Sequence, residues 1–153
     1  MKTMMPKRRG LLAVLAATAV LLIGNLAGAQ SGQRSGETFK ARLSVVPIDV
    51  TMQSTVAGLG SATAVLTGNK LTVSGTFDGL RSPATVARIH RGPKGIPGPA
   101  VFDLTISKAT SGTLSGSVEL TSSQVDDLKN GRFYVQIDSE RAPDGNLWGW
   151  LLR

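Results

Sequence analysis

Side chains that commonly carry catalysis are scarce in this chain of 153 residues. It contains a single histidine, His90, and no cysteine, and its serines are scattered, so no nucleophile is seen beside a base. Asp126 and Asp127 are adjacent in a stretch expected to be helical, where neighbouring side chains point in different directions, which suits capping better than acid–base chemistry. We therefore expect a protein that is not an enzyme, unless catalytic partners converge only in the fold.

His90 belongs to the stretch Thr85–Pro99, where a strand-like alternation runs into a loop rich in glycine and proline. Alternation along a strand puts Arg88 and His90 on the same face. A metal ion needs three or four converging donors, and here a guanidinium next to the imidazole opposes a cation. The simplest interpretation of His90 is therefore a hydrogen-bonded or solvated histidine.

The loop Gly92–Pro99 contains Gly-x-y triplets, but far too few for a collagen helix, which also needs three chains. Its prolines keep it stiff, and we expect Ile96 to be exposed, which suits a contact surface. Arg88, Arg91 and Lys94 cluster around the loop as binding positions for an acidic partner or an anionic polysaccharide; a solvated basic rim is the alternative. Because aromatic side chains for base stacking are not interleaved, we expect no nucleic-acid partner.

The closing stretch Asn146–Arg153 carries Trp148 and Trp150, two positions apart and therefore on one face of a strand. Two tryptophans on one face suit a sugar-stacking surface or a dimer contact. The alternative is that a neighbouring strand, the helix or the N-terminal segment covers them. These two residues are the second candidate binding position in the sequence.

Residues 1–29 have the three parts of a secretory signal peptide in their usual order. Basic residues precede an apolar run from Leu11 to Ile23, and Ala27–Ala29 is the small-x-small pattern that a signal peptidase accepts. We expect a secreted or periplasmic protein that begins near Gln30, with an uncleaved membrane anchor as the alternative. Residues 30–37 follow as a flexible lead-in and residues 38–153 as one domain, because the length does not allow two.

The formal charge of +7 belongs largely to this signal, which holds four of the 17 basic residues. Residues 30–153 keep 13 basic against 10 acidic residues, and a net charge of +3 is too small to indicate nucleic-acid binding. Because the chain has no cysteine, the exported domain must be stabilised by its core alone.

Short alternating runs, separated by turn residues about every ten positions, predict an antiparallel all-β domain that positions these side chains. A capping box at Thr121–Gln124 predicts one short helix that stops at Asn130–Gly131 and plugs one end of the domain. Ala142–Gly145 is expected to be the turn before the last strand. About eight strands predict a β-sandwich or a flattened Greek-key barrel. The runs are Phe39–Val46, Ile48–Val56, Ser61–Leu66, Lys70–Phe77, Thr85–Arg91, Ala100–Ile106, Thr113–Leu120, Phe133–Ser139 and Asn146–Arg153.

Several segments resemble, in the same order, those of the CHRD domain family, which is named for the chordin proteins and is present in many exported microbial proteins. They cover the chain from about Ser61 to Leu151, and it is their collinear order that is specific. The resemblance implies an extracytoplasmic β-sandwich whose biochemical role is poorly defined. The segments are Ser82–Thr85, Ala87–His90, Gly92–Pro99, Ser111–Gly116, Leu120–Gln124, Leu128 with Gly131, Tyr134–Ser139 and Pro143–Gly149.

The resemblance also brings in a metal-binding alternative. The family has a His-x-His strand similar to the ligand strand of copper/zinc superoxide dismutases, and a further histidine in its Tyr-Val strand. This chain has Arg88 and Asp138 at two of these positions, so only His90, with Asp138 as a second donor, remains for copper or zinc. We expect Arg88 and Asp138 to form an ion pair instead, stabilising by no more than about 1 kcal/mol if exposed. No cofactor is therefore favoured.

These patterns predict an exported, non-catalytic binding or structural module. Its partner is expected to be an extracellular protein or polysaccharide, or a second copy of the chain through the last strand. The alternative is a dismutase-like redox or metal-storage protein that binds copper or zinc.

Overall fold

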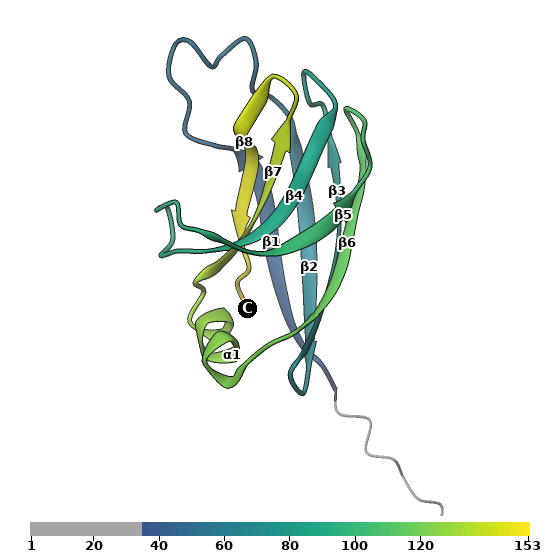
Figure 1. Cartoon of the computed structure of the whole chain (residues 1–153), viewed down its shortest axis with the longest axis vertical. Helices are drawn as coiled ribbons and strands as arrows, with labels where there is room; N and C mark the ends of the chain where they lie inside the picture. The colour runs from purple at the N-terminus through teal and green to yellow at the C-terminus, as the bar shows by residue number, and fades with distance from the viewer. Residues whose placement is uncertain (1–34) are drawn as a thin grey trace, which may run out of the picture. The chain divides into compact units, whose positions relative to one another are not determined.

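The computed structural model describes residues 35–153, and the predicted signal segment, residues 1–29, lies outside this range. The described part contains eight strands and one helix (Figure 1). They are β1 (Glu37–Val45), β2 (Leu59–Thr67), β3 (Lys70–Asp78), β4 (Ala84–Arg91), β5 (Ala100–Ile106), β6 (Gly112–Glu119), α1 (Ser122–Lys129), β7 (Phe133–Ser139) and β8 (Ala142–Trp150).

The strands form one closed antiparallel barrel in the order β1-β2-β3-β6-β5-β4-β7-β8, with β8 pairing back to β1. Strands β4, β5 and β6 are neighbours in sequence and in space, and β7 returns through α1 to lie beside β4. This is Greek-key order. The prediction of an all-β domain of about eight strands with one short helix is confirmed, and closure of the barrel gives every strand two neighbours.

Alternation along the strands fills the barrel with apolar side chains. In β1, for example, Phe39, Ala41 and Leu43 are buried, whereas the side chains between them are exposed. The outward residues of β1 include Lys40 and Arg42. The same strand therefore contributes to the core on one face and carries positive charge on the other.

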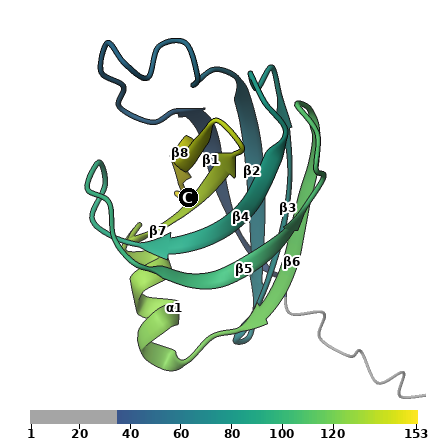
Figure 2. The same cartoon turned by 45° about the horizontal axis from the view of Figure 1, so that its top comes forward.

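Helix α1 covers one end of the barrel, as expected. Its capping box is complete: the Gln124 backbone N–H donates to the Thr121 hydroxyl at 3.3 Å, and the Thr121 N–H donates to the Gln124 side chain at 2.9 Å. Leu128 is fully buried in the core of the barrel. Figures 1 and 2 show α1 at the end of the barrel opposite to the β1–β2 loop. Within residues 35–153, no helix is long and apolar enough to cross a membrane.

The prediction of a strand over Ile48–Val56 is wrong, because this segment is a loop between β1 and β2. The Asp49 carboxylate accepts the backbone N–H groups of Thr51 and Met52 at 2.8 and 3.0 Å, which fixes a turn where a strand ladder would run. Apolar alternation alone misled here, since Val50 is 83% exposed.

The prediction of a turn at Ala142–Gly145 before the last strand is also wrong. The turn lies at Glu140–Arg141, and Ala142 already pairs with Ser139 as part of β8. The next register pair joins Ile137 to Leu147, so the intervening residues of β8 form a bulge opposite one residue of β7. A proline and a glycine in the segment 142–145 mark this bulge and not the turn itself.

Candidate ligand-binding site

Three aromatic side chains form a row across the outward face of β4, β7 and β8. The register pairs His90 with Tyr134, and Tyr134 with Trp150. The His90 and Tyr134 ring centroids are 5.1 Å apart and nearly parallel, and those of Tyr134 and Trp150 are 4.6 Å apart. We call these three residues the aromatic row. The histidine and one of the tryptophans, two separate candidates in the sequence, thus belong to one layer.

The loop Gly92–Pro99 folds back over the aromatic row and bonds to each of its members. The Gly98 N–H donates to the Tyr134 hydroxyl at 2.9 Å, and His90 Nδ1 lies 2.9 Å from the Gly98 carbonyl oxygen. The Trp150 indole N–H donates to the Gly92 carbonyl at 3.1 Å. A Cβ at Gly98 would overlap the Arg91 carbonyl oxygen, so glycine is required for this close approach. The loop is a fixed cover on the barrel wall.

This cover decides which candidate residues are accessible. Tyr134 is fully buried and Trp150 is 9% exposed, although both lie on the outward face of the barrel. Ile96, at the far side of the loop, is 58% exposed, as the sequence predicted. Of the possible covers considered for the tryptophans, none was the Gly/Pro loop, because its return over β8 depends on hydrogen bonds that the sequence does not display.

Trp148 lies in the next row and remains half-buried. Its ring meets Tyr134 edge-on, with centroids 5.9 Å apart at 86°, and meets Trp150 at 4.8 Å and 68°. The two tryptophans therefore do not form one flat stacking surface. Trp148 alone is available, held rigidly by its two aromatic neighbours.

Trp148 lines a groove of about 280 Å³ that crosses from β8 to β1. We call this groove the basic groove. Gly149 lets β8 lie close against β1 along this groove, because a Cβ there would overlap the backbone carbonyl of Arg42. The groove carries three cationic side chains and, among the described residues that line it, no acidic one. It is lined by Lys40, Arg42, Ser44, Lys94, Trp148, Gly149, Trp150 and Leu152.

The arginines predicted to cluster around the loop are engaged elsewhere. Arg88 lies 3.1 Å from Asp103 and 3.6 Å from Asp138, so the expected Arg88–Asp138 pair is present across β4 and β7. Arg91 donates to both carboxylate oxygens of Asp127, at 2.6 and 3.2 Å, and this hydrogen bonding raises the pKa of its guanidinium. Of the three predicted cations only Lys94 lines the basic groove.

The side chain of Asp138 is only 9% exposed, and this burial changes the pKa of its carboxyl. Burial raises the pKa of its carboxyl, and the hydrogen bond from Gln136, at 2.9 Å, together with Arg88 opposes that rise. His90 lies close enough to act on it as well, and its Nε2 is buried without a hydrogen-bond partner among the described residues. Arg88, His90 and Asp138 therefore share one face of the sheet.

The two donors of the copper or zinc alternative, His90 and Asp138, both have protein partners. Within residues 35–153, no three His, Cys, Asp or Glu side chains come together as a metal ion requires. Asp138 is occupied by a guanidinium and an amide, and the Nδ1 of His90 is bonded to the loop. The residues that the copper or zinc alternative depends on are thus used in holding strands and loop together.

A second groove, of about 260 Å³, lies on the other side of Trp148 between the β1–β2 loop and the Gly/Pro loop. Asn146 fixes the first of these loops: its side chain accepts the Ala57 N–H and donates to the Ala57 carbonyl, both at 3.2 Å. Asn146 is fully buried. Its place next to turn-like residues in the sequence did not indicate that it would hold a distant loop. The lining residues are Val46, Pro47, Met52, Gly95, Pro97, Gln136, Asp144 and Trp148.

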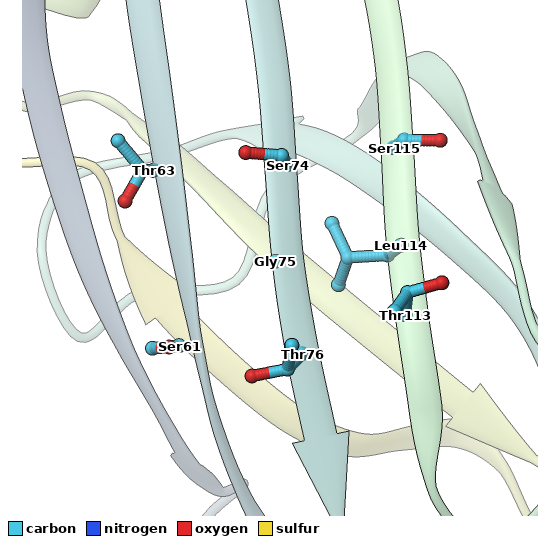
Figure 3. A pocket seen from close by; sticks show the side chains of 8 residues that line it. All are labelled: Ser61, Thr63, Ser74, Gly75, Thr76, Thr113, Leu114 and Ser115. Carbon is cyan, nitrogen blue, oxygen red and sulfur yellow. The ribbon is translucent and has the colours of Figure 1, made fainter.

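A larger hollow, of about 430 Å³, is on a different face, over β2, β3 and β6. Figure 3 shows its six hydroxyl side chains on three neighbouring strands, which we call the hydroxyl face: Ser61, Thr63, Ser74, Thr76, Thr113 and Ser115. No charged or aromatic side chain lines it. Its size comes from small outward side chains, and it offers neither charge nor a stacking surface to orient a ligand.

Lys40 and Arg42 were missed as site residues. The alternation of β1 does show that they face outward, but it does not show which strand lies beside them. Only the closure of the barrel by the pairing of Ser44 with Trp148 brings them next to the tryptophan. That pairing joins the two ends of the described chain and has no local signal in the sequence.

Comparison with protein families gave a match to the CHRD domain over residues 39–151. Comparisons with curated proteins and with solved structures gave no match. The matched region contains the whole of β2 to β8 and α1, and with them the aromatic row and most of the basic groove. It also includes residues of β1 before the segment on which the sequence resemblance depended. A match over most of the chain, with the expected all-β fold, shows that this protein belongs to the CHRD domain family.

Proposed function

We propose that this protein is an exported, non-catalytic binding module that holds an extracellular ligand on the barrel face around Trp148. Family membership supports a small β domain with a binding or structural role. Export is inferred from the signal-like residues 1–29. The absence of a nucleophile–base pair in the sequence favours binding over catalysis.

One observation carries the binding proposal: a rigid, half-buried tryptophan separates two grooves beside a loop that is pinned to the barrel. The hydrogen bonds to the aromatic row fix Lys94, Gly95 and Pro97 on the rims of these grooves. A site that is formed before the ligand arrives loses little conformational entropy on binding. The aromatic layer therefore supports the loop, and the loop and Trp148 present the ligand surface.

A homodimer through the last strand requires a particular geometry. Because β8 already pairs with β7 and β1, a second copy cannot add to its edge. It would have to contact the outward face around Trp148, in competition with any other ligand. Ligand binding and dimerisation through this face are therefore mutually exclusive in the proposal.

Two measurements test the proposed function. Mass spectrometry of the protein recovered from the cell envelope and the medium should give an N-terminus near Gln30. Capture on immobilised neutral and acidic glycans and on extracts of surface proteins should then be compared between the native chain and Trp148→Ala. We expect Trp148→Ala to weaken capture strongly, whereas Leu59→Ala, which removes an exposed apolar side chain outside both grooves, leaves it unchanged. A cytoplasmic protein, or capture that does not depend on Trp148, contradicts the proposal.

A further inference from the structure

The basic groove points to the chemical class of the ligand. Resting on the proposed function, we infer that it binds an acidic saccharide: a sugar ring lies against Trp148, and the carboxylate or sulfate of that ring or its neighbour is held by Arg42, Lys40 and Lys94. These four side chains come from β8, β1 and the Gly/Pro loop and meet only in the folded barrel.

The cations of the groove differ from five other basic side chains, which form ion pairs. Arg88, Arg91 and Arg132 pair with Asp103, Asp138 or Asp127, and Lys129 and Arg153 pair with Glu37. Lys40, Arg42 and Lys94 form no ion pair within residues 35–153, the part of the chain that contains all ten acidic residues. Four more basic residues within residues 35–153 form no ion pair either, but they do not line the groove: Lys70, Arg81, Lys108 and Arg141.

Three like charges along one groove repel one another and attract an anion. Their positions on the groove walls focus this attraction on the space beside Trp148. An anionic ligand therefore satisfies side chains that the protein itself leaves without counter-charges, which a neutral ligand does not. This charge complementarity selects an acid among the extracellular ligands.

Among anionic ligands, Trp148 favours a saccharide, because its ring offers a surface on which a sugar can stack. Trp148 is fixed edge-on against Tyr134 and Trp150, so it contributes apolar contact area at little entropic cost. At about 280 Å³, the groove is slightly smaller than typical small-molecule sites of roughly 300–1,000 Å³, and it suits one ring of a longer chain. A nucleic acid would need several accessible aromatic rings for successive bases, and here Trp150 is covered.

An anionic membrane is the rival occupant, because Ile48, Val50 and Ile96 are exposed on the two loops that border the second groove. A bilayer surface is broad, however, whereas the three cations line a recess between strands and loop. Apolar contacts with a membrane would involve the loop tips and not the half-buried Trp148. The saccharide accounts for both the cations and the tryptophan, and the membrane becomes an outcome of the test.

Isothermal titration of the purified chain with matched probes tests the inference. One arm compares a galacturonate hexasaccharide with its fully methyl-esterified form, and the other compares a heparin hexasaccharide with its desulfated form. The first arm tests carboxylates and the second sulfates. We expect at least one acidic probe to bind at least about tenfold more tightly than its matched control, with a gap that narrows as salt is added.

Variants then assign the binding to the groove. Arg42→Glu and Lys94→Glu should each weaken the acidic probe about tenfold and leave the matched control within about twofold. Trp148→Ala should weaken both members of a pair, because stacking does not depend on charge. Arg81→Glu makes the same change of charge just before the first residue of β4, whereas Lys94 follows the last. It should change the affinity for neither the acidic probe nor its control. Circular dichroism and thermal unfolding show whether each variant is folded.

The outcomes are distinct. Equal affinity for acidic and neutral members, lost in Trp148→Ala, overturns the inference and leaves the proposed function standing. The inference is overturned if phosphatidylglycerol vesicles, titrated in the same way, bind and neither acidic saccharide does. It is also overturned if an acidic saccharide binds and neither Arg42→Glu nor Lys94→Glu weakens its binding. If neither acidic nor neutral saccharides bind, the inference fails, and if surface proteins are not captured either, the proposed function fails with it.

Discussion

The two outward faces of this barrel are built on the same inward alternation and differ in what their surface side chains do. On the hydroxyl face, over β2, β3 and β6, small side chains lie on strands that pair in continuous register and make no ion pairs or aromatic contacts. On the face over β1, β8, β7 and β4, aromatic rings, ion pairs and a returning loop form an additional layer. A core-forming pattern therefore constrains only one side of a strand.

Burial of a side chain on the barrel wall does not by itself place it in the core. Tyr134 is as deeply buried as any core residue but points outward, and it supports the loop that borders the basic groove. The hydroxyl face has the larger hollow but no comparable internal support. We therefore propose that the ligand binds on the face where the fold has a second layer to hold charged and aromatic groups in position.

The largest effect should come from removing a covered member of the aromatic row. Trp150→Ala should reduce the free energy of unfolding by about 3–5 kcal/mol, because a 9% exposed ring is replaced by a cavity and the Gly92 carbonyl loses its donor. Trp148→Ala should cost about 1–2 kcal/mol, since its ring is only half-buried. Urea unfolding followed by circular dichroism measures both. Equal losses would mean that the two tryptophans do not have separate roles.

A smaller loss should follow from detaching the loop without removing a ring. Tyr134→Phe deletes the hydroxyl that bonds to Gly98 and should cost about 1–2 kcal/mol. Hydrogen exchange should accelerate at the Gly98 amide and remain unchanged on β3. An unaltered exchange rate at Gly98 would show that the loop is held by other contacts.

The buried acid of this face should make stability depend on pH. Because burial raises the folded-state pKa of Asp138, the folded protein binds this proton more tightly than the unfolded chain. Its stabilising contribution is complete below the unfolded pKa and is lost as the pH rises through the folded pKa. Asp138→Asn should remove this loss, so the variant should gain stability relative to the native protein, by less than about 1 kcal/mol, between the two pKa values.

Unfolding curves at a series of acidic to neutral pH values measure that difference. Asp144→Asn, an exposed carboxyl that also faces Asp138, serves as the matched control and should show a smaller change. A relative stability of Asp138→Asn that decreases toward neutral pH would mean that Arg88 and Gln136 outweigh burial.

The smallest effects belong to the hydroxyl face. Ser74→Ala and Thr76→Ala should each change the free energy of unfolding by less than about 0.5 kcal/mol, because both side chains are exposed. Neither should alter saccharide binding. A loss of more than about 1 kcal/mol, or of binding, would contradict the assignment of different roles to the two faces.

Local sequence patterns were sufficient for most of the fold. Strand alternation predicted strands at Lys70–Phe77 and Phe133–Ser139, which are β3 and β7, and the Thr121–Gln124 motif predicted the helix start. Alternation failed where a carboxylate at Asp49 gave the backbone other hydrogen-bond partners. The proline and glycine within residues 142–145 led to a predicted turn that is too late in the chain, because a bulge in β8 can carry the same residues as a turn.

The site was less predictable than the fold for a physical reason. His90, Trp148, Trp150 and Lys94 were recognised separately, but their convergence depends on register between distant strands and on the closing contact of β1 with β8. Arg88 and Arg91 were expected at the ligand, and their pairing with Asp138 and Asp127 shows that a cluster of charges in sequence does not reveal which are neutralised.

Nuclear magnetic resonance with an isotope-labelled chain tests the binding face most directly. On titration with the acidic hexasaccharides, the signals of the Trp148 indole N–H and of the Arg42 and Lys94 amides should shift together and saturate at one affinity. The Ser74 and Thr76 amides of the hydroxyl face should remain in place. Shifts confined to the hydroxyl face, or no shift at Trp148 with any of the acidic saccharides, would contradict the assignment of the ligand to the basic groove.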